Sequence, residues 1–207
     1  MPMQALLLVD LQNDFLPGGA LAVPDGEAVI PIANRLMARF HTVVASQDWH
    51  PENHRSFAAQ HPGHHVGETV ELNGCQQVLW PVHCVQDSPG AGLTATLNTD
   101  RITRVVQKGT DREIDSYSAF FDNGHLKQTE LHDYLQAMEV TSLAVLGLAT
   151  DYCVKFTVLD ALELSYKVTV VVDAIRGVDL VEGDCASALQ EMSAAGAMMV
   201  NSADLPG

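Results

Sequence analysis

The sequence has no long apolar run and few basic residues. No apolar stretch among the 207 residues is long enough to cross a bilayer. The start reaches an acid at Asp10 without a preceding basic region, which predicts a first strand rather than a signal peptide. Eleven lysines and arginines stand against 26 acids, for a net charge of −15. Because nucleic acids and anionic membranes bind basic surfaces, we expect neither as a partner.

Cysteine is also scarce, and its spacing excludes a disulfide framework. The four cysteines form no CxxC pair or regular pattern: Cys75, Cys84, Cys153 and Cys185. This usage predicts reduced thiols and a cytoplasmic location. The hydrophobic fraction of 47% and the charged fraction of 18% are typical of globular proteins. We expect one domain over residues 1–207, with no internal repeat.

Short apolar runs alternate with helical patterns along most of the chain. Strands are predicted at 5–9, 42–46, 104–108, 142–147, 167–173 and 197–201, and helices at 27–40, 129–139, 151–166 and 182–195. This alternation predicts an α/β fold: a three-layer α/β/α arrangement with a mostly parallel, doubly wound (Rossmann-like) sheet. Residues 48–100 are irregular and rich in His, Pro and Gly, so we interpret them as a long functional loop.

Cys153 follows the predicted strand 142–147 and lies in the first turn of the next helix. Asp151 is a suitable N-cap for that helix. Free backbone N–H groups and the helix dipole would favour a thiolate there and could hold an oxyanion. Taken alone, a small inert core cysteine is the simpler interpretation.

Two further polar residues stand at the ends of predicted strands. Asp10 closes the first apolar run and Lys108 closes the run at 104–108. Carboxyl ends of parallel strands converge on one crevice, so both could lie beside Cys153. A cysteine nucleophile needs a base and later an acid, which Asp10 could supply, while Lys108 could stabilise the charged pair. The alternative is that Asp10 caps a turn and Lys108 is a solvated strand end.

A second group of polar residues lies in the histidine-rich segment. Asp48 and His50, two residues apart after a strand, would project to the same side of an extended chain. With His83 they form a reasonable site for a first-row metal ion. His54 could be a fourth ligand or a supporting group. The other nearby histidines are interpreted as solvated: His61, His64 and His65.

Taken together, these segments resemble the nicotinamidase/pyrazinamidase family of the isochorismatase-like hydrolase superfamily. The matching segments are Val-Asp-Leu-Gln-Asn-Asp-Phe (9–15), Ser-Gln-Asp-Trp-His-Pro-Glu-Asn-His (46–54), Trp-Pro-Val-His-Cys-Val (80–85), Gln-Lys-Gly (107–109) and Gly-Leu-Ala-Thr-Asp-Tyr-Cys-Val (147–154). The cysteine and aspartate motifs alone identify only the superfamily. The segments at 46–54 and 80–85 are the specific part.

The resemblance implies a set of catalytic residues. Asp10, Lys108 and Cys153 would form the catalytic triad. A cis peptide between Leu148 and Ala149 would direct the N–H groups of Ala149 and Cys153 into an oxyanion hole.

The resemblance also implies the binding residues. Asp48, His50 and His83 would hold one divalent metal ion, with zinc as the first choice and iron or manganese as alternatives. Three aromatic residues would line the pocket, the first two sandwiching a flat ring: Phe15, Trp80 and Tyr117.

The expected activity is hydrolysis of nicotinamide to nicotinate and ammonia through a cysteine thioester in NAD salvage, with pyrazinamide as a second substrate. Hydrolysis of another small amide is the nearest alternative. A metal-binding or regulatory protein that has lost activity is a second. A dinucleotide-binding oxidoreductase is a third, although no GxGxxG follows the first strand. The sequence leaves open the metal, the order of preference among ring amides, and whether the chain forms a homo-oligomer.

Overall fold

A six-stranded sheet forms the centre of the molecule. The computed structural model describes residues 3–205, and every neighbouring pair of strands in this sheet is parallel. The strand order is β5-β2-β1-β6-β7-β8. The strands are β1 (Met3–Val9), β2 (Thr42–Asp48), β5 (Arg104–Lys108), β6 (Val140–Leu148), β7 (Lys167–Arg176) and β8 (Met198–Val200). The predicted parallel sheet is confirmed.

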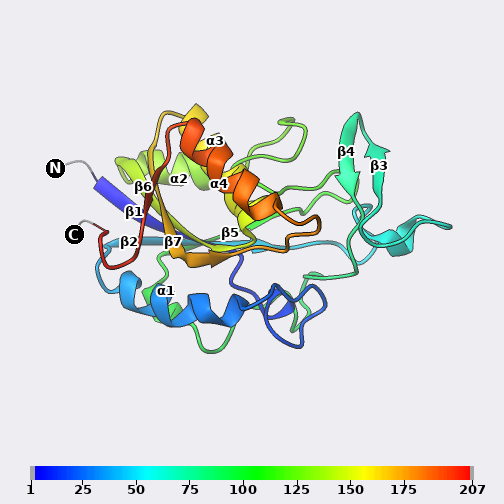
Figure 1. Ribbon diagram of the computed structural model, residues 1–207, viewed down its shortest axis with the longest axis horizontal. Helices are drawn as coiled ribbons and strands as arrows, with labels where there is room; N and C mark the ends of the chain where they lie inside the picture. The colour runs from blue at the N-terminus through cyan, green and yellow to red at the C-terminus, as the bar shows by residue number, and fades with distance from the viewer. Residues whose placement is uncertain (1–2, 206–207) are drawn as a thin grey trace.

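Helices cover both faces of the sheet, as predicted for three layers (Figure 1). Helix α1 (Val29–Met37) lies on one face, and α2 (Leu131–Ala137), α3 (Lys155–Glu163) and α4 (Asp184–Ala194) lie on the other. Strand β1 shows why both faces are apolar: Leu6 and Leu8 belong to the core beneath α1, while Leu7 and Val9 belong to the opposite core. Among the described residues, no helix has the length and apolar character needed to span a membrane.

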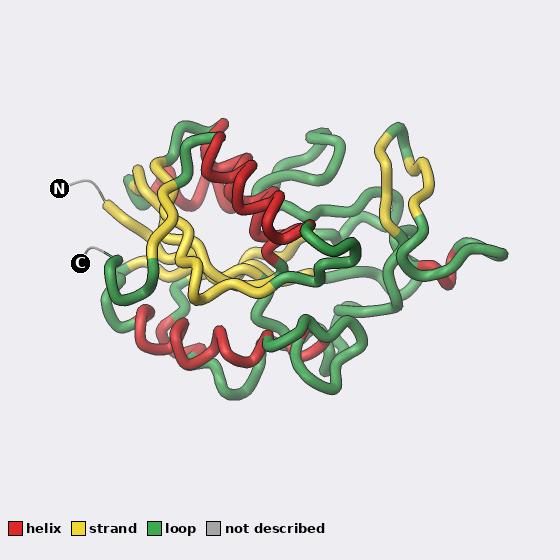
Figure 2. Tube along the Cα trace, viewed as in Figure 1, coloured by secondary structure: helices red, strands yellow, loops and turns green. Residues whose placement is uncertain are grey.

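The predicted loop 48–100 contains an antiparallel hairpin that the sequence analysis missed. Its strands are β3 (Thr69–Leu72) and β4 (Cys75–Val78), and it stands apart from the central sheet (Figures 1 and 2). Asn73 and Gly74 connect the strands with φ angles of 52° and 81°. Asn-Gly is the preferred pair for a tight hairpin turn, so this dipeptide was the available signal. Each strand is only four residues long and half of its residues are apolar at most, so neither forms an apolar run that a search of the sequence would find.

The chain order creates one crevice at the carboxyl ends of the strands. From β1 the chain builds outward to β2 and β5, and then returns beside β1 to build β6, β7 and β8. Such a reversal is where open parallel sheets bind ligands. Asp48 pairs with Lys108 across β2 and β5, and Val9 pairs with Gly147 across β1 and β6. Gly147 is required there, because a Cβ would lie 2.1 Å from the Val9 carbonyl oxygen.

Candidate active site

Asp10, Lys108 and Cys153 meet at this crevice, as their positions at strand ends predict. The Lys108 Nζ lies 2.9 Å from the Asp10 Oδ2 and 3.4 Å from the Cys153 Sγ. It also donates to the Asp48 Oδ1 at 2.5 Å and to the Ser116 carbonyl at 2.9 Å. All of these side chains are buried, so Lys108 is an anchored cation rather than a solvated strand end.

The charges in this cluster are set by burial and by pairing. Burial opposes the charge on Lys108, but the carboxylates of Asp10 and Asp48 outweigh it and raise the Lys108 pKa well above its usual value. Burial likewise opposes the charge on Asp48, yet Lys108 and His50 hold its pKa well below the usual range. Asp10 differs, because burial raises its pKa despite the opposing effect of Lys108. Asp48 and Lys108 therefore form a charged pair beside a carboxyl group that accepts a proton more readily than usual.

The Cys153 thiol does not follow the simple expectation for a helix N-terminus. Burial raises its pKa well above the usual value, and Asp10 and Asp48 add to this effect while Lys108 opposes it. The loss of solvent on burial, which the sequence position alone does not reveal, outweighs the helix dipole. The thiol therefore holds its proton more tightly than an ordinary cysteine, and a base must take that proton before the sulfur can attack.

Asp151 does not cap the helix as predicted. The first turn, Thr150–Val154, is a π-helical turn that precedes α3, and Ala149 occupies the N-cap position without a side-chain cap. The Asp151 carboxylate instead accepts hydrogen bonds from the backbone N–H groups of Val178 and Asp179, at 3.0 and 2.7 Å. It therefore ties the loop after β7 to the turn that carries the cysteine.

The peptide bond between Leu148 and Ala149 is cis, as the family resemblance implied. The Ala149 carbonyl accepts hydrogen bonds from the N–H groups of Tyr152 and Val154. Within residues 3–205 the Ala149 N–H donates no hydrogen bond, and Ala149 and Cys153 both line the same pocket. The Ala149 N–H is therefore available to a ligand.

Asp48, His50 and His83 come together beside this cluster. Their candidate ligand atoms lie within 4.8 Å of one another, and the Nε2 atoms of His50 and His83 lie 3.6 and 3.8 Å from the Asp48 Oδ2. His50 Nδ1–H donates to the Gly109 carbonyl at 2.9 Å, and His83 Nδ1–H donates to the Pro81 carbonyl at 2.8 Å. These bonds leave a lone pair on each Nε2, as in metal-ligating histidines.

An unsatisfied atom tests whether this group suits a metal ion. The His50 Nε2 is buried and has no hydrogen-bond partner in the described part of the chain. A buried acceptor without a partner is costly, and a cation would satisfy it. Two imidazole nitrogens and one carboxylate also match the ligands that zinc and related ions prefer. The residues therefore fit a divalent metal.

His54 is packed against this group but uses its nitrogens elsewhere. Its ring lies 4.3 Å from the His50 ring, centroid to centroid. The Nδ1 accepts from the Ser56 backbone N–H at 3.2 Å and lies 2.7 Å from the Ser56 Oγ. The Nε2 therefore carries the proton and faces the Ile114 carbonyl at 3.4 Å. In this arrangement His54 has no free lone pair to offer.

An aromatic pocket connects the two clusters. It is lined by the three aromatic residues expected from the sequence, by Cys153, and by Asp48 and His83 of the candidate metal group. The other residues of its lining are Leu21, Asp115, Ala149, Tyr152 and Val178. The Phe15 ring packs against the His83 ring at 5.6 Å, and the Trp80 and Tyr152 rings meet edge to face at 4.8 Å. A small flat ligand in this pocket would touch the thiol and the metal-ligand group together.

Sequence reasoning missed two buried polar residues of this site. The Ser46 hydroxyl donates to the Asp10 Oδ1 at 2.6 Å, which fixes the carboxylate. Its signal was a polar residue inside a fully buried strand, two positions before Asp48. Asp115 lines the pocket and lies in an irregular segment, where no sequence pattern marked it.

Comparison with known proteins gives a consistent result. A family model described as the isochorismatase domain matches residues 4–204. The nicotinamidase of Escherichia coli (strain K12) is 55% identical over 208 residues, covering 99% of this chain and 97% of that protein. The structure of an Acinetobacter baumanii nicotinamidase/pyrazinamidase has a TM-score of 0.96 at 43% identity, covering 100% of this chain and 99% of that one. The zinc complex of Pyrococcus horikoshii pyrazinamidase has a TM-score of 0.78 at 36% identity, covering 97% and 99%. The chain belongs to the isochorismatase domain family.

Proposed function

We propose that this protein hydrolyses nicotinamide to nicotinate and ammonia in the salvage of NAD. One observation carries the proposal: Cys153, which contacts Lys108 beside Asp10, lines the same aromatic pocket as Asp48 and His83, two members of the Asp48–His50–His83 group. The relatives at 55% and 43% identity, which are named for this activity, support it. Pyrazinamide has the same carboxamide on a similar flat ring, so we propose it as a second substrate.

Cys153 is the proposed nucleophile and Asp10 its base. The Asp10 Oδ2 makes no well-aligned hydrogen bond within the described residues and can take the thiol proton. The thiolate sulfur then attacks the amide carbon, and the N–H groups of Ala149 and Cys153 stabilise the oxyanion. Asp10 returns the proton to the nitrogen as the carbon–nitrogen bond breaks, which releases ammonia and leaves a thioester.

The same residues complete the second half of the reaction. Asp10 takes a proton from a water molecule, and the resulting hydroxide attacks the thioester carbon. The carbon–sulfur bond breaks, the proton on Asp10 returns to the Cys153 sulfur, and the carboxylic acid product loses its own proton to solvent and leaves as nicotinate. Lys108, 2.9 Å from the Asp10 Oδ2 and 3.4 Å from the Cys153 Sγ, stabilises the negative charge wherever it resides.

Asp48, His50 and His83 are the proposed ligands of one divalent metal ion, with zinc as first choice and iron or manganese as alternatives. When bound, such an ion supplies a Lewis-acidic contact for a ring nitrogen or a water molecule. We assign His54 a supporting role, because its nitrogens are occupied by Ser56 and Ile114. Phe15, Trp80 and Tyr117 would hold the ring by its faces and edges.

We also propose that the enzyme works in the cytoplasm. All four cysteines are free thiols, which suits the reducing compartment expected from the sequence.

The direct test is ammonia release from nicotinamide by purified protein, before and after chelation and after restoring the metal. We expect rapid release that chelation removes and added zinc, iron or manganese restores. Pyrazinamide and a non-aromatic amide such as acetamide serve as comparison substrates. Absence of release from nicotinamide by protein with a full complement of metal would overturn the proposal.

A further inference from the structure

The hairpin β3–β4 buries one polar side chain toward the active site. Gln77 on β4 is 2% exposed, whereas the adjacent Gln76 is exposed. Burying a carboxamide costs free energy unless its donors and acceptor find partners. The contacts of Gln77 therefore indicate what the hairpin contributes.

Gln77 reaches two residues of the substrate pocket without lining it. Its Nε2 donates to the Asp115 Oδ2 at 3.0 Å and to the Tyr117 hydroxyl at 3.1 Å. The Val78 carbonyl, at 2.8 Å, is a third acceptor for the same amide. Asp115 and Tyr117 both line the pocket that contains Cys153, while Gln77 is outside it. Gln77 can affect the substrate only through these neighbours.

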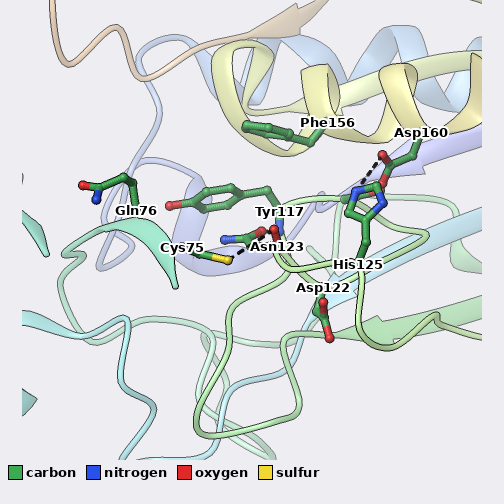
Figure 3. A pocket seen from close by; sticks show the side chains of 9 residues that line it. Cys75, Gln76, Tyr117, Asp122, Asn123, His125, Phe156 and Asp160 are labelled. Carbon is green, nitrogen blue, oxygen red and sulfur yellow. Dashed lines mark hydrogen bonds and ion pairs between the residues drawn. The ribbon is translucent and has the colours of Figure 1, made fainter. Parts of the chain in front are cut away.

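Tyr117 is held from several sides. Its hydroxyl oxygen accepts from the Trp80 Nε1 at 3.1 Å as well as from Gln77. Its backbone N–H donates to the Asn123 Oδ1 at 2.9 Å, and its ring stacks on Phe156 at 5.4 Å. Figure 3 shows the Tyr117 ring between Phe156 and Asn123, at the wall of a neighbouring cavity of about 290 Å³. Both lone pairs of the Tyr117 hydroxyl are therefore occupied. The hydrogen bond from Trp80 fixes the orientation of the two rings relative to each other, with their planes at 87°.

Asp115 depends on the same amide. Gln77 is the only side chain that donates to the Asp115 carboxylate within residues 3–205; the other donor is the backbone N–H of Ser116. An Asp115 oxygen also lies within 4.8 Å of ligand nitrogens of His50 and His54. Without Gln77, this buried carboxylate could turn toward the imidazoles or into the pocket.

We propose that Gln77 is a positioning residue for substrate binding: its carboxamide fixes the Trp80–Tyr117 wall and holds Asp115 in place. This inference rests on the proposed function, because the wall is assigned to the pyridine ring. The amide lies outside the pocket and bonds to none of Asp10, Lys108 and Cys153, so Gln77 acts on the binding of the ring and leaves the chemistry at Cys153 largely unaffected.

The test compares Gln77→Met with Gln76→Met in full-length, metal-loaded protein. Methionine keeps the size of the side chain but removes both donors. We expect Gln77→Met to raise the KM for nicotinamide roughly tenfold and to change kcat less than about threefold. Gln76→Met, at the exposed neighbour, should match wild type. A folded Gln77→Met protein with wild-type KM, or one that loses thermal stability while KM stays unchanged, would overturn the proposal.

Two further variants separate positioning from folding. Gln77→Glu keeps the shape but places a second carboxyl group against Asp115, and it should raise KM at least as much as Gln77→Met. Tyr117→Phe removes the shared hydroxyl, so Gln77→Met should add less to KM in that background than in wild type. A wild-type KM for Gln77→Glu, or strict additivity in the double variant, would contradict the role.

A substrate-free measurement distinguishes failure of this inference from failure of the proposed function. Trp49→Phe leaves Trp80 as the only tryptophan. In that background, Gln77→Met should shift the Trp80 emission, while Gln76→Met should not. If wild-type protein releases no ammonia from nicotinamide, the proposed function fails, but a shift in emission still supports the positioning of Trp80. An unchanged emission with active wild-type enzyme overturns only the role of Gln77.

Discussion

The two halves of the site are built differently. The half containing Asp10, Lys108 and Cys153 comes from the ends of β1 and β5 and from the turn after β6. The half containing Asp48, His50 and His83 begins at the end of β2 but continues into the long segment between β2 and β5. In the first half the register of the sheet fixes the side chains. In the second half, hydrogen bonds that the imidazoles donate to the Gly109 and Pro81 carbonyls orient the rings.

This contrast indicates what each half tolerates. Strand ends are held by many cooperative hydrogen bonds, so a substitution in the first half should change chemistry more than structure. Loop residues depend on a few specific contacts, so a substitution in the second half should change metal content and stability as well. The experiments below test this division, beginning with the largest effect.

Cys153→Ala should remove nearly all turnover and leave structure and metal content intact. We expect kcat to fall by roughly 10⁴-fold or more, because the covalent route is lost. Nicotinate binding by calorimetry and metal content should remain close to wild type. Cys185→Ala, at a half-buried cysteine outside the pocket, is the matched control. More than a hundredth of wild-type activity in Cys153→Ala would rule out the thioester.

Asp48→Ala should affect both halves. It removes a proposed metal ligand and also the partner of Lys108 at 2.5 Å. Breaking a buried ion pair costs about 3 to 5 kcal/mol, so urea unfolding should show a loss of that size. Metal analysis should find less than one ion per chain, and KM should rise. Normal metal content in this variant would refute the ligand assignment.

Ser46→Ala should produce an intermediate effect confined to the chemistry of the first half. The lost bond is the 2.6 Å hydrogen bond to the Asp10 Oδ1. A hydrogen bond to a charged group contributes about 1.5 to 3 kcal/mol, so kcat should fall by roughly 10- to 150-fold, with KM and metal content unchanged. Thr42→Val, a buried hydroxyl at the other end of β2, should leave kcat unaffected. Equal kcat values for wild type and Ser46→Ala would show that Asp10 needs no such support.

His54→Gln should have the smallest effect on metal binding. Because its nitrogens are engaged by Ser56 and Ile114, the variant should keep one metal ion per chain. The lost packing against His50 should lower the free energy of unfolding by about 1 kcal/mol. His83→Gln, by comparison, should lose the metal. Loss of metal from both variants would make His54 a ligand after all.

The same contrast explains what could be predicted from the sequence. Parallel strands align their carboxyl ends, so Asp10, Lys108 and the turn carrying Cys153 could be placed together from strand positions alone. Asp48 and His50 could be paired because they are two residues apart after a strand. His83 lies 33 positions beyond His50, so its spacing gives no link to Asp48 and His50. The link came from the segment Trp-Pro-Val-His-Cys-Val (80–85) that contains it.

Other features depend on contacts that no local pattern encodes. Gln77 and Asp115 are 38 positions apart and meet only when the hairpin folds against the pocket. Asp151 has the residue type and the position of an N-cap. The first turn is π-helical, however, and the Asp151 carboxylate accepts hydrogen bonds from Val178 and Asp179 in the nearby loop. The raised pKa of Cys153 follows from burial, which requires the packed fold.

One carboxylate connects the two halves, and that connection has a thermodynamic consequence. Asp48 uses Oδ1 for Lys108 and turns Oδ2 toward His50 and His83. A cation bound at Oδ2 would draw electron density from the Asp48 carboxylate and weaken its interaction with Lys108. Lys108 would then stabilise the Cys153 thiolate more strongly. The coupling is reciprocal. If a bound metal ion raises the ionisation constant of the Cys153 thiol by some factor, ionisation of the thiol raises the affinity for the metal ion by the same factor. The rate at which an alkylating reagent modifies Cys153 would therefore serve as a gauge of metal occupancy.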